Sequence, residues 1–185
     1  MIKVALYGKP GAGKSTLAEL LNREFSAMGR PVVTLKLAAP LYTLQAVIHT
    51  FAGRPMTDGS QQDGLLLNDL AAHLRRINPA ALTEPFARRL AQAAALHPDG
   101  VALCDDMRAA DVEALRALHF TLVEVSAPEE LRRTRKAARN DLSPGNDDHP
   151  TEAVPTCEPH HRVINDGDVH LLRRRAAELA REVLR

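Results

Sequence analysis

The chain has 185 residues and a formal net charge of +1, with 45% hydrophobic, 25% charged and 3% aromatic residues. This length predicts one domain over residues 1–185, whose core must be built from Leu, Val, Ile and Ala because aromatic residues are scarce. The balanced charge argues against a general polyanion binder, so extended nucleic-acid binding is not expected.

A phosphate-binding loop pattern lies near the start of the chain. Residues 2–7 (IKVALY) predict a buried strand, and residues 8–15 (GKPGAGKS) match G-x-x-x-x-G-K-[ST] at every fixed position. An amphipathic helix follows, with Leu17, Leu20, Leu21, Phe25 and Met28 on one face, and Gly29 and Pro31 end it. Strand, loop and helix together distinguish this motif from a glycine-rich turn with a chance lysine.

The chemistry of the loop predicts ATP and Mg²⁺ as its ligands. Glycines let several backbone amides approach one phosphate tail, and the helix N-terminus adds its partial positive charge there. We expect Lys14 to reach the β- and γ-phosphates and the Ser15 hydroxyl to hold Mg²⁺. The residues predicted to contact ATP are Gly8, Gly11, Ala12, Gly13, Lys14, Ser15 and Thr16.

The sequence predicts a cytoplasmic location for the protein. Cys104 and Cys157 lie in different contexts, so a disulfide is not expected, as in a reducing compartment. The first strand already carries the motif and is not a removable signal, and no apolar run reaches membrane-spanning length. Neither a membrane partner nor a particular oligomer is indicated, and monomer and homodimer both remain open.

Strands and helices alternate along the rest of the chain. Further strands are predicted at residues 31–37, 101–104, 120–125 and 162–164. Helices are predicted after Pro40 (with Leu41, Leu44, Val47, Ile48 and Phe51 at helical spacing), over 65–76, from Asn78-Pro79 to about 96, from Asp111 to 118, from 128, and after the cap Asp168. This order predicts a parallel sheet with helices on both faces.

Two acids follow a buried strand at Asp105 and Asp106. The carboxyl edge of a parallel sheet is where ligands bind, so Asp106 is predicted to help Ser15 hold Mg²⁺, although a strand-end turn rich in Asp is the simpler alternative. Arg108 follows closely and could pair with an anionic substrate.

A basic run follows at residues 132–139. Arg132, Arg135 and Arg139 are spaced to share one helix face, which is often only a solvated surface. Alternatively, arginines on a closing segment stabilise the charge of phosphoryl transfer, which predicts a lid over about 128–148. A separate group of Asp147, Asp148, His149, Cys157, His160 and His161 has residue types that suit zinc, but not a compact ligand spacing; His149 is better interpreted as a substrate contact or a loop-fixing residue.

The order of motifs resembles the deoxynucleoside monophosphate kinases of phage and bacterial type, a branch of the P-loop nucleotide kinases. The similar segments are residues 37–41 (LAAPL, family F-A-D-P-L-K), 63–70 (DGLLLNDL) with Arg75 (family D-R-x-L-L-Q-x-L-G…R), 104–108 (CDDMR, family D-V-R), and 148–152 (DHPTE) with 163–167 (VINDG) (family H-x-S-E…I-x-N-x-G). Ala39, Tyr42, Gly64 and Ala71 or Ala72 depart from residues usual in the family, all in the acceptor half, where a modified pyrimidine nucleotide would be a suitable acceptor.

The resemblance implies a three-layer α/β fold with a five-stranded parallel sheet in the order 2-3-1-4-5. It implies an acceptor-binding helical insert over about 40–97, an Arg-bearing lid, and transfer of the ATP γ-phosphoryl group to a nucleoside or deoxynucleoside monophosphate. Lys14, Asp106, Arg132, Arg135 and Arg139 would be the catalytic residues, and the substrate-binding residues would be Lys36, Arg75, Arg108, His149 and Asn165.

Three rival functions remain open. A kinase on this scaffold could act on a metabolite of the dephospho-coenzyme A or phosphomevalonate kind, or on a hydroxymethylated base or nucleic-acid end. A nucleotide-binding module without transfer is the rival from another class, although the arginines and Asp106 fit catalysis better.

Overall fold

The central sheet is parallel, five-stranded and ordered β2-β3-β1-β4-β5, which confirms the predicted topology. The computed structural model describes residues 1–59, 61–138, 141–146 and 149–185. The strands are β1 (Ile2–Tyr7), β2 (Val32–Thr34), β3 (Val101–Cys104), β4 (Thr121–Ser126) and β5 (His161–Ile164). β2 is shorter than predicted over 31–37, because the chain leaves the sheet after Leu35, whose amide still donates to the Leu103 carbonyl.

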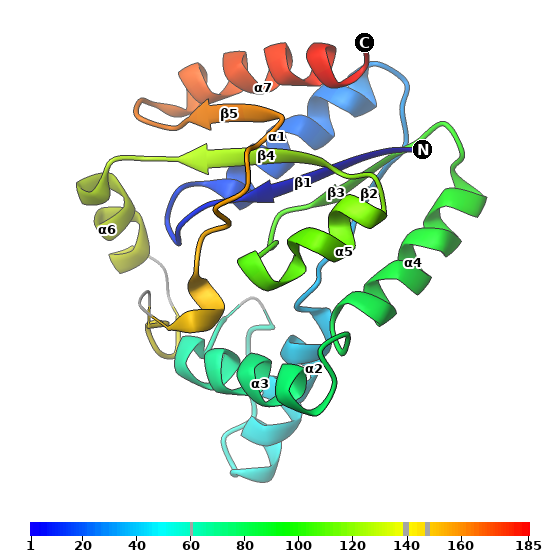
Figure 1. Ribbon diagram of the computed structural model, residues 1–185. Coiled ribbons are helices and arrows are strands. Elements are labelled where there is room, and N and C mark those ends of the chain that lie inside the picture. The colour runs from blue at the N-terminus through cyan, green and yellow to red at the C-terminus, as the bar shows by residue number, and fades with distance from the viewer. Residues whose placement is uncertain (60, 139–140, 147–148) are drawn as a thin grey trace.

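Helices cover both faces of the sheet (Figure 1). α1 (Lys14–Ala27) and α7 (Val169–Val183) bury leucines and alanines on one face. α4 (Thr83–Leu96) and α5 (Val112–Ala117), preceded by the short helix η1 (Ala109–Asp111), pack on the other. The two apolar layers use different side chains of the same strands, as alternation along a strand requires, so the molecule has three layers.

α2 (Ala39–Phe51) and α3 (Gly64–Ile77) stand beyond the carboxyl edge of the sheet, and α6 (Glu129–Ala137) stands at the same edge near the phosphate loop (Figure 1). The predicted insert over about 40–97 includes α4, but the α4 residues Phe86 and Leu90 are buried on the sheet. The insert that stands off the sheet is therefore α2 and α3, held by a small apolar cluster of Leu41, Ala71 and Leu82.

The apolar spacing in α2 does not mark a buried face. Of the five apolar residues singled out, Leu41 is buried, whereas Val47 and Ile48 are exposed and Phe51 is 90% exposed. Gln45 is buried instead, and its carboxamide accepts from the Asp63 amide and donates to the Gln61 carbonyl. The helix thus uses a polar side chain to hold the chain that leads into α3.

Two helix starts differ from the prediction. Asn78 is the C-cap of α3, and its side chain accepts from the Ala80 amide, so α4 begins only at Thr83 after a turn. Asp111 precedes α5 but its carboxylate is used elsewhere, as described below. Asp168 caps α7 as predicted, accepting from the Leu171 amide, and this hydrogen bond lowers the pKa of Asp168.

Both cysteines are free thiols. Within the described ranges, no helix has both the length and the apolar composition needed to cross a bilayer, and no group of three or more metal-ligating side chains occurs there. Arg139, Asp147 and Asp148, which entered the predictions for the lid and for zinc, lie outside the described residues.

Candidate active site

The phosphate loop between β1 and α1 is shaped by glycines with positive φ. Gly8 has φ 140°, and a Cβ there would lie 2.0 Å from the Val125 carbonyl oxygen. Gly13 has φ 95°, and a Cβ there would lie 2.2 Å from Nδ2 of Asn165. Only glycine satisfies both the conformation and the close approach at these positions, which leaves the loop amides free to curl around an anion.

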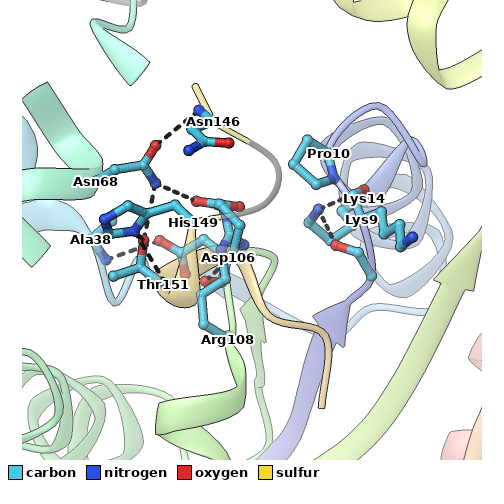
Figure 2. A network of polar contacts seen from close by, with 12 residues as sticks. Lys9, Pro10, Lys14, Ala38, Asn68, Asp106, Arg108, Asn146, His149 and Thr151 are labelled. Atoms are coloured by element: carbon cyan, nitrogen blue, oxygen red, sulfur yellow. Dashed lines mark hydrogen bonds and ion pairs between the residues drawn. The ribbon is translucent and has the colours of Figure 1, made fainter. Parts of the chain in front are cut away.

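Lys14 lies folded against its own loop. Its Nζ donates to the carbonyls of Gly8 at 2.8 Å and Lys9 at 3.3 Å (Figure 2). Desolvation, with a smaller contribution from the Arg108 charge, lowers the pKa of Lys14 to about 7. A bound polyphosphate would reverse this effect, because a negative charge beside the amine favours its protonated form.

Asn165 supports the loop from the side of β5. It is buried, and its Nδ2 donates to the Ala12 carbonyl at 2.9 Å. Arg135 of α6 donates to the Asn165 backbone and side-chain oxygens at 3.3 and 3.4 Å, and Arg132 donates to the Pro10 carbonyl at 3.4 Å. The first part of the predicted lid is therefore packed against the loop and Asn165, with Arg135 at the cleft wall.

The two acids that follow β3 have different partners. Asp106 accepts from the Leu37 and Ala38 amides with one carboxylate oxygen each, and burial raises its pKa although these bonds act in the opposite sense. Asp105 is buried and pairs with Lys36 through Oδ1 and Nζ at 2.5 Å. Asp106 thus fixes the chain that enters α2, whereas Asp105 is paired with a side chain, and both acids line the cleft together with Lys36.

Two arginines beyond these acids are held by carboxylates. Arg75 of α3 pairs with Asp111 at 2.9 Å, and the other oxygen of Asp111 accepts from the Arg108 amide at 3.0 Å. The Arg108 guanidinium pairs with Glu152 at 3.0 Å. Asp111 is buried, so this acid orients the Arg75 guanidinium and fixes the backbone at Arg108, while Glu152 holds the Arg108 side chain.

The described residues 141–146 and 149–152, which we call the α6–β5 connection, lie against α3. Ser143 donates to the Asp63 carboxylate at 2.5 Å, and the Gly64 amide donates to the Ser143 carbonyl at 3.1 Å. Burial of the Asp63 carboxylate acts to raise its pKa, but the hydrogen bonds from Ser143 and from the Leu66 amide outweigh it, so the pKa of Asp63 is lowered. The short helix η2 (Pro150–Glu152) places Thr151 and Glu152 against Asn68.

These elements enclose a cleft of about 580 Å³. The predicted site residues that line it are Gly11, Gly13, Lys14, Ser15, Thr16, Lys36, Arg75, Asp106, Arg108 and Arg135. Five other predicted residues lie outside its wall, namely Gly8, Ala12, Arg132, His149 and Asn165. The Nδ1 atom of His149 lies 2.8 Å from the Thr151 hydroxyl and accepts from the Thr151 amide, so this side chain fixes the loop around it (Figure 2).

Sequence reasoning missed three functional candidates in the wall, Asn68, Asp111 and Glu152. Asn68 and Glu152 lie inside two of the segments that carry the family resemblance, but the sequence gives no sign that their side chains contact each other. The sequence predicts a helix cap at Asp111, because an acid before an apolar helix is the ordinary cap signal. Its pairing with Arg75, 36 positions away, leaves no local signal.

Solved structures share this fold. A protein called TT1252 from Thermus thermophilus superposes with a TM-score of 0.57 at 22% identity, covering 98% of this chain and 97% of that chain. A protein called APE1195 gives 0.53 at 21% identity, covering 100% and 97%. An APS kinase from Mycobacterium tuberculosis, solved with AMPPNP and APS, gives 0.52 at 16% identity, covering 99% and 95%.

The chain has the fold of the P-loop kinases. At these identities the likeness concerns the fold alone. No family model and no curated protein matches the chain, so its resemblance to deoxynucleoside monophosphate kinases stays a prediction.

Proposed function

We propose that the protein transfers the γ-phosphoryl group of ATP to a nucleoside or deoxynucleoside monophosphate. The observation that carries this proposal is one shared cleft, which has the phosphate loop with Lys14 on one wall and two oriented guanidinium groups, Arg75 and Arg108, on another. A phosphoryl donor and a phosphoryl acceptor that each carry a phosphate match Lys14 on one wall and the two arginines on the other.

The chain contributes mainly position and charge in this proposal. The loop amides and Lys14 would bind the donor phosphates, and Arg75 and Arg108, each already aligned by an acid, would bind the acceptor phosphate. Arg135 lines the cleft beside the loop and would neutralise charge that develops on the moving group. Arg132 would act indirectly, because it contacts the loop at Pro10.

The acids at the sheet edge fit Mg²⁺, since carboxylate and hydroxyl oxygens are the ligands that this ion prefers. Both oxygens of Asp106 already accept backbone amides, so we reassign the acidic contribution from Asp106 to Asp105, with Ser15 as predicted. Asp105 lines the cleft and is paired there with the half-exposed cation of Lys36. When bound, the ion would neutralise phosphate charge.

A second acceptor class has one observation in its favour. The three cations of the acceptor half are each paired, Lys36 with Asp105, Arg75 with Asp111 and Arg108 with Glu152. This balance also suits a hydroxyl-bearing metabolite without a phosphate. The APS kinase that shares the fold was solved with AMPPNP and APS, so the fold itself does not restrict the acceptor to a nucleoside monophosphate.

The test is ADP release from Mg-ATP against all ribo- and deoxynucleoside monophosphates, 5-modified pyrimidine monophosphates, and unphosphorylated nucleosides, with Lys14→Ala as the blank. Strong turnover with one or two monophosphates supports the proposal. Turnover that is confined to unphosphorylated acceptors, or absent while ATP still binds, would reject it.

A further inference from the structure

Asn68 ties two parts of the α6–β5 connection to the acceptor helices. Asn68 lies on α3 and is 5% exposed. Its Nδ2 donates to the Thr151 hydroxyl at 3.0 Å and to the Glu152 carboxylate at 3.1 Å, and its Oδ1 accepts from the Asn146 amide at 3.1 Å (Figure 2). A carboxamide suits this place because it donates and accepts at once.

The same carboxylate of Glu152 holds Arg108. Its Oε2 lies 3.0 Å from the Arg108 guanidinium, while its Oε1 accepts from Asn68. The Glu152 side chain is 15% exposed, so this ion pair is shielded from water and its strength depends on geometry. Contacts therefore run without a break from Asn68 through Glu152 to Arg108, a cation that lines the cleft.

We propose that Asn68 is a positioning residue, which couples the seating of the α6–β5 connection on α3 to the orientation of the Arg108 guanidinium. This inference rests on the proposed function, because it gives Arg108 the acceptor as its ligand. Asn68 holds Glu152 where its carboxylate aligns Arg108, so a displacement of residues 149–152 from α3 would take that partner away from Arg108. The acceptor site is then complete only while these contacts are made.

A second tether makes the idea testable in a folded protein. Ser143 contacts Asp63 and Gly64 independently of Asn68. Removal of the Asn68 hydrogen bonds therefore leaves residues 142 and 143 attached and does not touch the apolar layers of the sheet. The variant Asn68→Asp keeps the size of the side chain but replaces its donor by an acceptor. The new carboxylate at position 68 then faces the carboxylate of Glu152, and the two repel each other.

The kinetic test varies ATP and the acceptor separately. For Asn68→Asp we expect the acceptor KM to rise about tenfold or more, as for loss of hydrogen bonds to a charged group, with the ATP KM unchanged. Asn22→Asp is the matched control, because it makes the same change at an exposed position of α1 and should leave both constants as they are. An unchanged acceptor KM, or equal rises in both KM values, would overturn the proposal.

A hydrogen-exchange measurement without substrates gives a readout that does not need turnover. Asn68→Asp should speed amide exchange both in residues 149–152 and in residues 105–111, where the Arg108 amide is bonded to Asp111. Faster exchange in the first segment with no change in the second would show that the connection and Arg108 are not coupled. A wild-type enzyme without turnover would reject the proposed function, and this measurement would still decide the coupling.

The double variant Asn68→Asp/Glu152→Gln separates the two links of the chain of contacts. In the double variant the carboxamide at position 152 can donate to the carboxylate at position 68, which restores a hydrogen bond between them. Slow amide hydrogen exchange in residues 149–152 should therefore return. The neutral carboxamide introduced by Glu152→Gln brings no charge to Arg108, so the acceptor KM should stay high. Full recovery of the acceptor KM in the double variant would contradict positioning through the Glu152 charge.

Discussion

The carboxylate of Asp106 bridges two segments by accepting the backbone amides of Leu37 and Ala38, each at 3.0 Å. It thereby joins the end of β3 to the chain that enters α2. Asp106 and the adjacent Asp105 both line the cleft, but Asp105 pairs with the Lys36 side chain and not with backbone amides. Two neighbouring acids of identical chemistry thus serve different purposes, which their substitution should separate.

Asp106→Asn should lower the free energy of unfolding by about 1–3 kcal/mol, because its new amide group faces a backbone donor and leaves it unsatisfied. Asp105→Asn should lower kcat with a smaller loss of stability, since its partner Lys36 is half-exposed and can be rehydrated. Urea denaturation and steady-state kinetics of both variants measure the contrast. Equal losses of stability, or a kcat effect only in Asp106→Asn, would contradict the division of roles.

ATP affinity should fall as pH rises through about 7, the pKa to which desolvation lowers Lys14 in the free protein. Below this pH the amine is already charged; above it, binding must take up a proton, because the phosphates favour the charged form. The proton uptake should appear in calorimetric titrations with ATP at a pH above this pKa, in two buffers of different ionisation enthalpy.

Lys14→Gln supplies the baseline for that titration, because glutamine carries no proton to exchange. The variant should bind ATP more weakly, and its affinity should not fall across this pH range. The same loss of affinity with pH in Lys14→Gln would assign the effect to another group.

Gly64→Ala should destabilise the seating of the α6–β5 connection. A Cβ at position 64 would lie 2.3 Å from the Gly145 nitrogen and 2.5 Å from its Cα, and backbone atoms cannot rotate away. We expect a loss of about 1–3 kcal/mol in unfolding free energy, as for overpacking, although alanine alone would favour the helix. Gly59→Ala is the control, since nothing lies within 4 Å of its Cβ position; similar melting temperatures for the two variants would argue against this contact.

Asn165→Asp should weaken ATP binding while sparing the acceptor. The aspartate cannot donate to the Ala12 carbonyl, and it brings a negative charge beneath the phosphate loop. Loss of one buried hydrogen bond predicts a fall in ATP affinity of about tenfold. Isothermal titration with ATP checks this, and unchanged ATP affinity would show that the loop keeps its shape without Asn165.

The amino-acid sequence by itself determined the phosphate loop and the parallel sheet, while the strand order 2-3-1-4-5 came from the family resemblance. The loop is encoded in the consecutive residues from Gly8 to Ser15, because its conformation depends on glycines and on the helix that follows. The parallel sheet follows from the alternation of strands and helices, and the Asp168 cap from a local hydrogen bond.

Only the tertiary structure decided which polar groups meet across the cleft. Asp111, a cap by its sequence pattern, orients Arg75, and Asp106, predicted as a metal ligand, holds the amides of Leu37 and Ala38. Asn68 meets Glu152 over 84 positions of sequence. Local patterns report hydrogen bonds within one turn or loop, whereas the partner of a buried charge is set by the packing of distant elements and leaves no periodic signal in the chain.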